Sequence, residues 1–369
     1  MENVYNIEIQ AQPSIYAPQE RTLRICFSEP DAGVDKDTGL LLLIAGYGEN
    51  ISSPEYDKMR EWCSDSCNLI TVQCNYFGCE YMQNNIAPDI TMEELQDSLS
   101  SAEFELLQRD YDRYFHILKG KTFHQKVELD ETPELFNEMG LMQAIDNLRA
   151  VKVVMDIVKD NGYKLNEQRI YAYGCSQGAY LSYLCNALWP GLFTGIVDNS
   201  GFLIPYYLEH GHQQYVRDED ILIRQERIYR ALEFVEDREI YSLPHLYKQF
   251  KNQADIICFA GEKDEMVSLE EKKAFISNVE NAKVETITKF RIDMVLVKTT
   301  THGLGADFVG LFRYAYGRYL LPKEAEQKKK RKKEERQIRF EDVSYDTKMF
   351  RYEVKWEEGI PMLYRFRKE

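Results

Sequence analysis

One short segment, residues 169–180, constrains the fold of this chain more than any other. It reads RIYAYGCSQGAY, which is an apolar strand-like run, a turn bracketed by glycines, and then helix-forming residues. A strand, a Gly-x-Ser-x-Gly turn and a helix in this order are the pattern of a nucleophile elbow. Glycine at positions 174 and 178 allows a turn so sharp that larger side chains there would clash. The segment therefore predicts that Ser176 stands at the tip of a sheet, above the N-terminus of the following helix.

Strand and helix patterns alternate along most of the chain. Continuous apolar runs predict buried parallel strands at residues 40–45, 68–74, 170–173, 193–198 and 255–260, and a last core strand is expected at 294–298. Helical patterns lie at residues 54–67, 133–158, 179–188, 268–278 and 304–320. Residues 3–11 and 21–28 alternate apolar and polar side chains, as half-buried antiparallel strands do. We therefore expect an α/β fold with a mostly parallel central sheet, an antiparallel N-terminal edge and helices on both faces.

Two long segments do not fit the short connections of such a sheet. Residues 80–133 contain a polar helical stretch at about 91–118 and few strand signals. Residues 202–253 begin with aromatic side chains and continue with a helical, charged pattern. We expect both segments to be insertions that form a cap on a single domain of residues 1–321.

The last part of the chain, residues 322–369, is expected to be a C-terminal extension. Residues 323–339 hold nine Lys or Arg and four Asp or Glu, a net charge of +5, whereas the whole chain carries -15. Such a run is typical of a solvated helix or tether, and we favour this interpretation over a contact with RNA, a membrane or an acidic partner. The final residues alternate around Gly359 and predict a terminal hairpin.

Charge and cysteine usage limit the class of protein. A net charge of -15 argues against a nucleic-acid-binding protein. The N-terminus lacks the basic and apolar regions of a signal peptide, and no uncharged apolar run is long enough to cross a bilayer. The eight cysteines are therefore expected to be free thiols in a cytoplasmic protein. Cys63 and Cys67 share a helix face without a nearby histidine, so we expect them in the core, with no metal and no cofactor.

A serine nucleophile needs a base, and the base needs a group that orients it. Only six histidines are present, and His302 follows the expected last core strand. Asp264 follows the strand before it, and Asp198, one strand earlier still, is the alternative acid. Because the carboxyl ends of parallel strands meet at one edge of a sheet, we expect these side chains to meet Ser176 there.

A glycine-rich loop, Gly46-Tyr47-Gly48, follows an early buried strand and can present backbone N–H groups. Two aromatic residues, Tyr206 and Tyr207, lie at the start of the second insertion. Gly46, Gly48 and these two tyrosines are the candidates for a substrate pocket at the same edge of the sheet.

Four motifs in chain order resemble those of the α/β-hydrolase superfamily, over roughly residues 1–321. They are GYG at 46–48, GCSQG at 174–178, GEKDEMV at 261–267 and THG at 301–303. More narrowly, AYL at 179–181 and LFTGIVDNS at 192–200 resemble a poorly characterised bacterial family. Members of that family are sometimes labelled peptidase-like, and some are encoded near surface-glycosylation genes.

The resemblance implies a hydrolase fold and a role for each candidate residue. Ser176 would be the nucleophile, His302 the base and Asp264 the orienting acid. The backbone N–H groups of Tyr47 and Gln177 would form the oxyanion hole. Many relatives have His-Gly where this chain has Ala45-Gly46, but this departure removes no backbone donor.

Three functional hypotheses follow. The first is a serine hydrolase that cleaves an ester of a small molecule or glycan through an acyl-enzyme. The second keeps the same triad in a glycan O-acyltransferase or deacylase. The third, from another class, is a non-catalytic binding protein that inherited the fold. An occluded elbow, or a distance between Ser176 and His302 far beyond hydrogen-bond reach, would favour the third.

Overall fold

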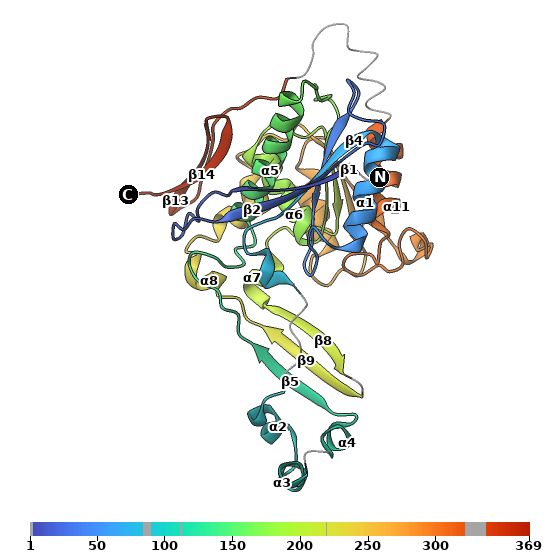
Figure 1. The fold of residues 1–369 in the computed structure, drawn as a ribbon, viewed down its shortest axis with the longest axis vertical. Coiled ribbons are helices and arrows are strands. Elements are labelled where there is room, and N and C mark those ends of the chain that lie inside the picture. Colours follow the sequence, from blue (N-terminus) through green and yellow to red (C-terminus); the bar gives the residue numbers. More distant parts are fainter. Residues whose placement is uncertain (1–2, 84–89, 111–112, 219, 322–336) are drawn as a thin grey trace.

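The computed structural model describes residues 3–83, 90–110, 113–218, 220–321 and 337–369, and its centre is an eight-stranded sheet (Figure 1). The strand order is β1-β2-β4-β3-β6-β7-β10-β11. β1 pairs antiparallel with β2, and β2 pairs antiparallel with β4, whereas the other neighbours are parallel. The strands are β1 (Asn3–Gln10), β2 (Thr22–Glu29), β3 (Gly39–Ile44), β4 (Leu69–Asn75), β6 (Ile170–Cys175), β7 (Gly195–Asn199), β10 (Asp255–Gly261) and β11 (Ala282–Ile287).

Helices cover both faces of this sheet. Leu40 and Leu42 of β3 pack into one core cluster, which includes residues of α5 (Leu141–Asp160) and α6 (Gln177–Leu188). The alternate residues Leu41 and Leu43 pack into a second cluster, with α1 (Pro54–Cys67) and α11 (Phe308–Ala315). A strand buried on both faces must be apolar throughout, which is why β3 reads GLLLLI. The strand order and the two helical layers confirm the predicted α/β-hydrolase fold.

The predicted elbow is a sharp turn between β6 and α6. Ser176 adopts φ 55° and ψ -115°, a backbone conformation that costs energy for a residue with a side chain. A Cβ atom on Gly178 would lie 2.0 Å from the carbonyl oxygen of Ile44. A Cβ atom on Gly174 would lie 2.2 Å from the carbonyl carbon of Gly178. Only glycine at both positions allows the helix to start this close to the sheet.

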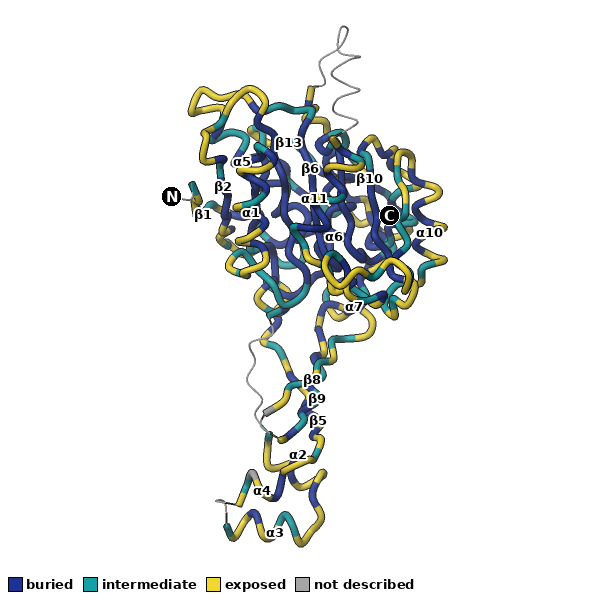
Figure 2. The backbone as a smooth tube through the Cα atoms, turned by 90° about the vertical axis from the view of Figure 1, so that its right-hand side faces the viewer, coloured by how far each residue is buried: buried dark blue, intermediate teal, exposed yellow. Residues whose placement is uncertain are grey.

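The two insertions combine into one arm, which we define as described residues 90–127 and 212–227. Its three-stranded sheet has the order β5-β9-β8, with β5 parallel and β8 antiparallel to β9. Short helices at the far end pack on Phe123 and Ile223. The arm extends away from the main sheet (Figure 1, Figure 2). Its elements are α2 (Met92–Ser98), α3 (Ser101–Arg109), α4 (Tyr114–Leu118), β5 (Thr122–Val127), β8 (His212–Asp218) and β9 (Ile221–Arg227).

The arm corrects two expectations. The first insertion contains a strand, β5, despite its weak strand signal, and the second contains the β8–β9 hairpin where a helical pattern was predicted. In β9, buried residues alternate with partly exposed ones, so Arg224 and Glu226 lie on the partly exposed face of a strand and Arg227 lies on the buried face. Residues 122 and 222 pair across a hundred positions of sequence, and no local pattern signals such a pairing. Short helices connect the arm to the main domain at α7 (Tyr206–His210), α8 (Ala231–Phe234) and α9 (Leu243–Leu246).

Three elements of the main domain also differ from the prediction. α5 begins at Leu141 and not near residue 133, because Met139 has φ 59° and the Glu138 carboxylate caps the amides of Gly140 and Met142. The last core strand is β11, not residues 294–298. Those residues form a turn in which the Asp293 carboxylate accepts three successive amides. The predicted last helix starts later for a similar reason, because Leu304 has φ 60° and α11 begins at Phe308.

The C-terminal part forms a third sheet, which is antiparallel and contacts α5 (Figure 1). Its strands are β12 (Val343–Asp346), β13 (Phe350–Glu357) and β14 (Ile360–Arg367), and β13 and β14 make a hairpin. The Gln12 side chain donates to and accepts from the backbone of Leu363, with both distances 2.7 Å. These bonds tie the sheet to the N-terminal edge of the main domain. Most of the predicted basic segment, residues 322–336, lies outside the described residues.

All eight cysteines are buried free thiols, and Cys63 and Cys67 belong to the core between α1 and the sheet. Within the described ranges, no helix combines the length and apolar character that a membrane span requires.

Candidate active site

Ser176, His302 and Asp264 lie in one hydrogen-bonded row at the carboxyl edge of the main sheet. The Nε2 atom of His302 is 2.8 Å from Ser176 Oγ. The Nδ1 atom of the same ring is 2.9 Å from Asp264 Oδ2. Ser176 comes from the β6–α6 turn, Asp264 follows β10, and His302 lies in the long loop between β11 and α11. The fold thus brings together three predicted residues that are far apart in the sequence.

The partners of His302 hold its ring in place. Asp264 Oδ1 accepts the backbone N–H groups of Met266 at 2.9 Å and Val267 at 3.2 Å, so its carboxylate is fixed by its own turn. The Phe202 ring stacks on His302, with centroids 5.2 Å apart and an interplanar angle of 6°. The His302 side chain is 18% exposed, and Ser176 is 9% exposed. Asp264 and Phe202 thus fix the His302 ring, and the serine of the row is largely buried.

Asp198, the alternative acid, has other partners. Its Oδ1 accepts the Gly201 N–H at 2.6 Å, and its Oδ2 lies 2.8 Å from both Tyr183 Oη and Lys272 Nζ. Lys272 is 1% exposed, and it also donates to the Gly201 carbonyl at 2.6 Å. Burial is the largest single effect on Lys272 and lowers its pKa, but the charge and hydrogen bond of Asp198, together with Cys258 and Asp264, leave the pKa above its usual value. Asp198 and Lys272 thus brace the loop that carries Phe202 onto His302, and it is Asp264 that contacts the histidine.

The Gly46-Tyr47-Gly48 loop lies against the elbow. A Cβ atom on Gly46 would be 2.9 Å from the Cys175 carbonyl oxygen and 3.8 Å from Ser176 Cβ. In the part of the chain that the structure describes, neither the Tyr47 amide nor the Gln177 amide donates a hydrogen bond. The Tyr47 amide belongs to the loop against the elbow and the Gln177 amide to the first turn of α6, and both are without an acceptor among the described residues.

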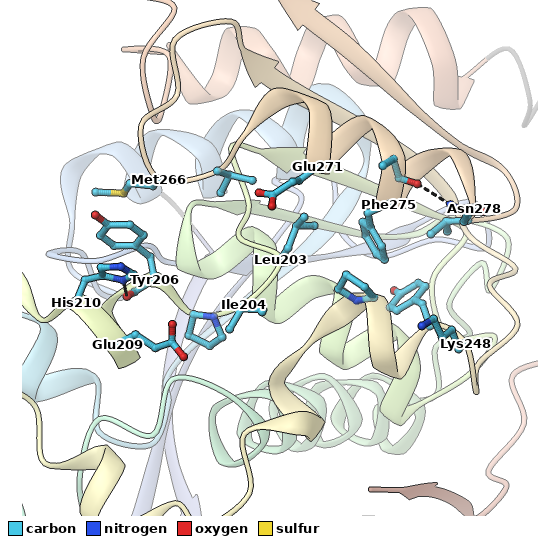
Figure 3. A pocket seen from close by; sticks show the side chains of 16 residues that line it. Leu203, Ile204, Tyr206, Glu209, His210, Lys248, Met266, Glu271, Phe275 and Asn278 are labelled. Carbon is cyan, nitrogen blue, oxygen red and sulfur yellow. Dashed lines mark hydrogen bonds between the residues drawn. The ribbon is translucent and has the colours of Figure 1, made fainter.

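A cavity of about 790 Å³ lies beside the acid turn, between α7, α9 and α10 (Leu269–Ser277) (Figure 3). Met266 and Val267, which follow Asp264, form part of its wall, and Phe275 and Val279 form a buried apolar part. Of the predicted pocket residues, Tyr206 lines this cavity, with its ring stacked on His210 at 4.3 Å.

The other predicted pocket residues lie elsewhere. Tyr207 contacts Met266 Sδ at 3.8 Å through its hydroxyl and packs on Tyr47, with ring centroids 5.1 Å apart. Gly46 and Gly48 belong to the loop above the elbow, and they do not line the 790 Å³ cavity. Tyr207 therefore stands between this cavity and the glycine-rich loop.

Sequence reasoning missed four residues around the site: Glu49, Phe202, Arg227 and Lys272. Glu49 belongs to the glycine-rich loop, and burial raises its pKa to about 7, with a smaller contribution from Glu55. Hydrogen bonds with the Tyr56 hydroxyl and the Gly46 backbone oppose this shift. An acidic residue in a surface loop gives no sequence signal of such burial. Among the described residues, no three His, Cys, Asp or Glu side chains are grouped as a metal site.

The strand order and this site define a protein of the α/β-hydrolase fold with a Ser-His-Asp row at its elbow. Residues 122–213 match a family described as a protein of unknown function (DUF2920). That stretch contains β5, α5, the elbow and the start of the arm hairpin. The chain matches no curated protein.

Solved structures with similar folds include esterases and peptidases. The chain is 15% identical to Est1E from Butyrivibrio proteoclasticus, solved with ferulic acid, over 82% of this chain and 96% of that one, with a TM-score of 0.47. It is 12% identical to a putative dipeptidyl aminopeptidase IV from Bacteroides ovatus over 87% of this chain and 36% of that one, with a TM-score of 0.49. It is 13% identical to Thermogutta terrifontis esterase 2, phosphonylated by sarin, over 83% and 94% of the two chains, with a TM-score of 0.42. The chemistry must therefore be argued from the site itself.

The buried pair of Asp198 and Lys272 generates a stability prediction. Lys272→Met leaves the Asp198 carboxylate buried without its cation, and we expect the free energy of unfolding to fall by about 3 to 5 kcal/mol. Denaturant-induced unfolding measures this change. Lys273→Met, at the exposed neighbouring position on α10, is the control and should change stability by less than about 0.5 kcal/mol. Equal stabilities of the two variants would contradict the assignment.

Glu49 generates a pH prediction. The folded protein holds the Glu49 proton up to about pH 7, whereas the unfolded chain releases it near 4.5. The folded state thus binds more protons between these values, so this group makes the free energy of unfolding fall as pH rises through this range. In Glu49→Gln, the decline between about pH 5 and about pH 8 should be smaller by roughly 2 to 3 kcal/mol, measured by denaturant titrations. Glu61→Gln, at an exposed position on α1, should keep the wild-type decline. Parallel curves for wild type and Glu49→Gln would refute the prediction.

Proposed function

We propose that this protein is a serine hydrolase that cleaves a carboxylic ester through an acyl-enzyme. One observation carries the proposal. Ser176 Oγ, on a strained elbow, lies 2.8 Å from His302 Nε2, and the other ring nitrogen of His302 lies 2.9 Å from Asp264. A nucleophile, a base within hydrogen-bond reach and a group that orients the base are the parts that nucleophilic acyl transfer requires. The 2.8 Å distance counts against the non-catalytic alternative.

We assign each step of this reaction to a residue of the site. As Ser176 Oγ attacks the ester carbonyl, His302 Nε2 takes the hydroxyl proton, and Asp264 stabilises the imidazolium through Nδ1–H. The oxyanion accepts the amides of Tyr47 and Gln177, and the N-terminal end of α6 adds positive potential. His302 then gives its proton to the leaving alcohol, which departs as the acyl-enzyme forms. A water molecule that His302 deprotonates attacks the acyl group, and the acid product and free Ser176 follow.

The cavity beside the acid turn supports a substrate with an apolar part. Its lining includes Met266, which is two residues after Asp264, and the buried side chains of Phe275 and Val279. A volume of about 790 Å³ is large enough for a medium-chain acyl group or an aromatic ring. We therefore propose that the apolar part of the ester binds there. The acyl-enzyme could equally pass its acyl group to a sugar hydroxyl, and product analysis with and without sugar acceptors separates the two reactions.

The nucleophile is tested by covalent labelling with a fluorophosphonate probe, followed by intact-mass measurement. We expect one adduct on the wild-type protein, none on Ser176→Ala, and slow or absent labelling of His302→Ala, because the serine is then no longer activated. Turnover of simple acyl esters should fall at least about 1,000-fold in either variant. A folded wild-type protein that acquires no adduct, or a Ser176→Ala variant with unaltered turnover, would overturn the proposed function.

The role of the cavity is tested by filling it. Ala274→Trp places an indole at the exposed rim of the cavity on α10. We expect KM for octanoyl esters to rise roughly 10-fold while acetyl-ester turnover stays within about twofold, since only the long chain needs the space. Lys273→Trp adds the same indole to an adjacent exposed position outside the cavity lining, and should leave both substrates unaffected. Equal effects of Ala274→Trp on both esters would contradict this role.

A further inference from the structure

Arg227, the last residue of β9, is a buried cation at the base of the arm. It is 0% exposed. Its Nη1 donates to the Tyr47 hydroxyl at 2.9 Å and also to the Gln83 carbonyl, which are both neutral oxygens. Its Nε and Nη2 are buried and have no hydrogen-bond partner among the described residues. Among the described residues, the guanidinium therefore has only these two neutral oxygens to compensate for its removal from water.

Such a group costs stability. Moving a charge into a protein interior carries a penalty of several kcal/mol, and replacing poorly compensated buried charges with apolar side chains is often stabilising. Stability alone therefore does not account for an arginine at this position. Among the described residues, the side chain that Arg227 hydrogen-bonds is Tyr47. A role for Arg227 would therefore act through Tyr47.

Three residues at the base of the arm hold the Tyr47 side chain from different directions. The His212 ring stacks on the Tyr47 ring with centroids 3.9 Å apart and an interplanar angle of 19°. The Tyr229 hydroxyl donates to the Tyr47 hydroxyl at 2.7 Å, next to the bond from Arg227. His212 and Arg227 are direct cross-strand partners in the β8–β9 hairpin. The hairpin thus presents both to Tyr47 from one face of the arm sheet.

His212 is suited to stacking because it carries no charge at neutral pH. Burial, and then the Arg227 charge, lower the pKa of His212 to about 4. A neutral imidazole can pack against a phenol beside a guanidinium without adding a second buried cation. Of the three residues that hold Tyr47, Arg227 thus carries a positive charge, whereas His212 and Tyr229 are neutral at pH 7.

The opposite end of Tyr47 is its backbone amide, which lies in the loop against the elbow, next to Gly46. Glycines on both sides give this loop little stiffness of its own. Its geometry therefore depends on what holds the Tyr47 side chain. We propose that Arg227 is a positioning residue: through the Tyr47 hydroxyl it holds the Tyr47 amide where it stabilises the oxyanion formed at Ser176. The base of the arm is then a working part of the active site. This inference rests on the proposed ester-hydrolase function.

The test compares Arg227→Met, Tyr47→Phe and the double variant, in the full chain, by fluorophosphonate labelling rate and ester kinetics. Losing full use of one oxyanion donor should lower kcat and kcat/KM together by about 10- to 100-fold, with little change in KM. The double variant should be no slower than the slower single variant, because both changes remove the same bond. Thermal unfolding of Arg227→Met should occur at the wild-type temperature or above it. A merely structural arginine would instead lower stability and leave the folded enzyme fully active.

Arg224→Met is the matched control. Arg224 lies on the same strand, three residues earlier, and donates to the Gln213 side chain at 2.6 Å, away from Tyr47. Its labelling rate and kcat should stay within about twofold of wild type. Tyr47→Phe keeps the inference testable if Arg227→Met does not fold, since it removes the same bond while retaining the stacked ring.

The outcomes separate this inference from the proposed function. If wild type acquires no adduct, the proposed function fails, and this inference fails with it. If wild type reacts, and Arg227→Met and Tyr47→Phe react at the wild-type rate, the hydrolase function stands and the positioning role is wrong. Additive losses in the double variant, or a change confined to KM, would also overturn it. A shared loss in kcat with retained stability is the result that the proposal requires.

Discussion

The contact between the elbow and the end of β3 governs the rest of this site. A Cβ atom at Gly178 would lie 2.0 Å from the Ile44 carbonyl oxygen, and one at Gly46 would lie 2.9 Å from the Cys175 carbonyl oxygen. Because both positions are glycine, the first turn of α6 and the loop after β3 can pack backbone against backbone. This close approach holds the loop that contains Tyr47 and the helix that begins at Gln177 against the elbow.

Buried charges around the site fall into two groups. The Asp198 carboxylate has Lys272, Tyr183 and an amide as partners, so its charge is compensated and its role is to brace a loop. Glu49 and Arg227 are different, because burial raises the pKa of Glu49 and leaves two nitrogens of Arg227 without partners. Both contact the glycine-rich loop. Groups whose burial is poorly compensated cost stability, and these two lie beside the loop that packs on the elbow, which is where the proposed reaction would take place.

The arm sheet contacts the loop that packs on the elbow. Two insertions separated by the elbow meet in one sheet, and the base of that sheet packs on Tyr47. The arm therefore extends away from the main domain while its inner end contacts the Tyr47 side chain.

The sequence alone determined the parallel core, the elbow at Ser176 and the candidates Asp264 and His302. Buried strands and glycine-bracketed turns can be recognised from a few neighbouring residues, because their apolar runs and glycine positions are local features of the chain. It left Asp198 open as the acid, and only the tertiary structure placed Lys272 against Asp198 and His302 against Asp264. It also missed β5 and the arm, since strand pairing across a hundred residues and the burial of Arg227 depend on long-range packing. Local chemistry sets the turns, whereas distant contacts decide which polar groups are buried, and with which partners.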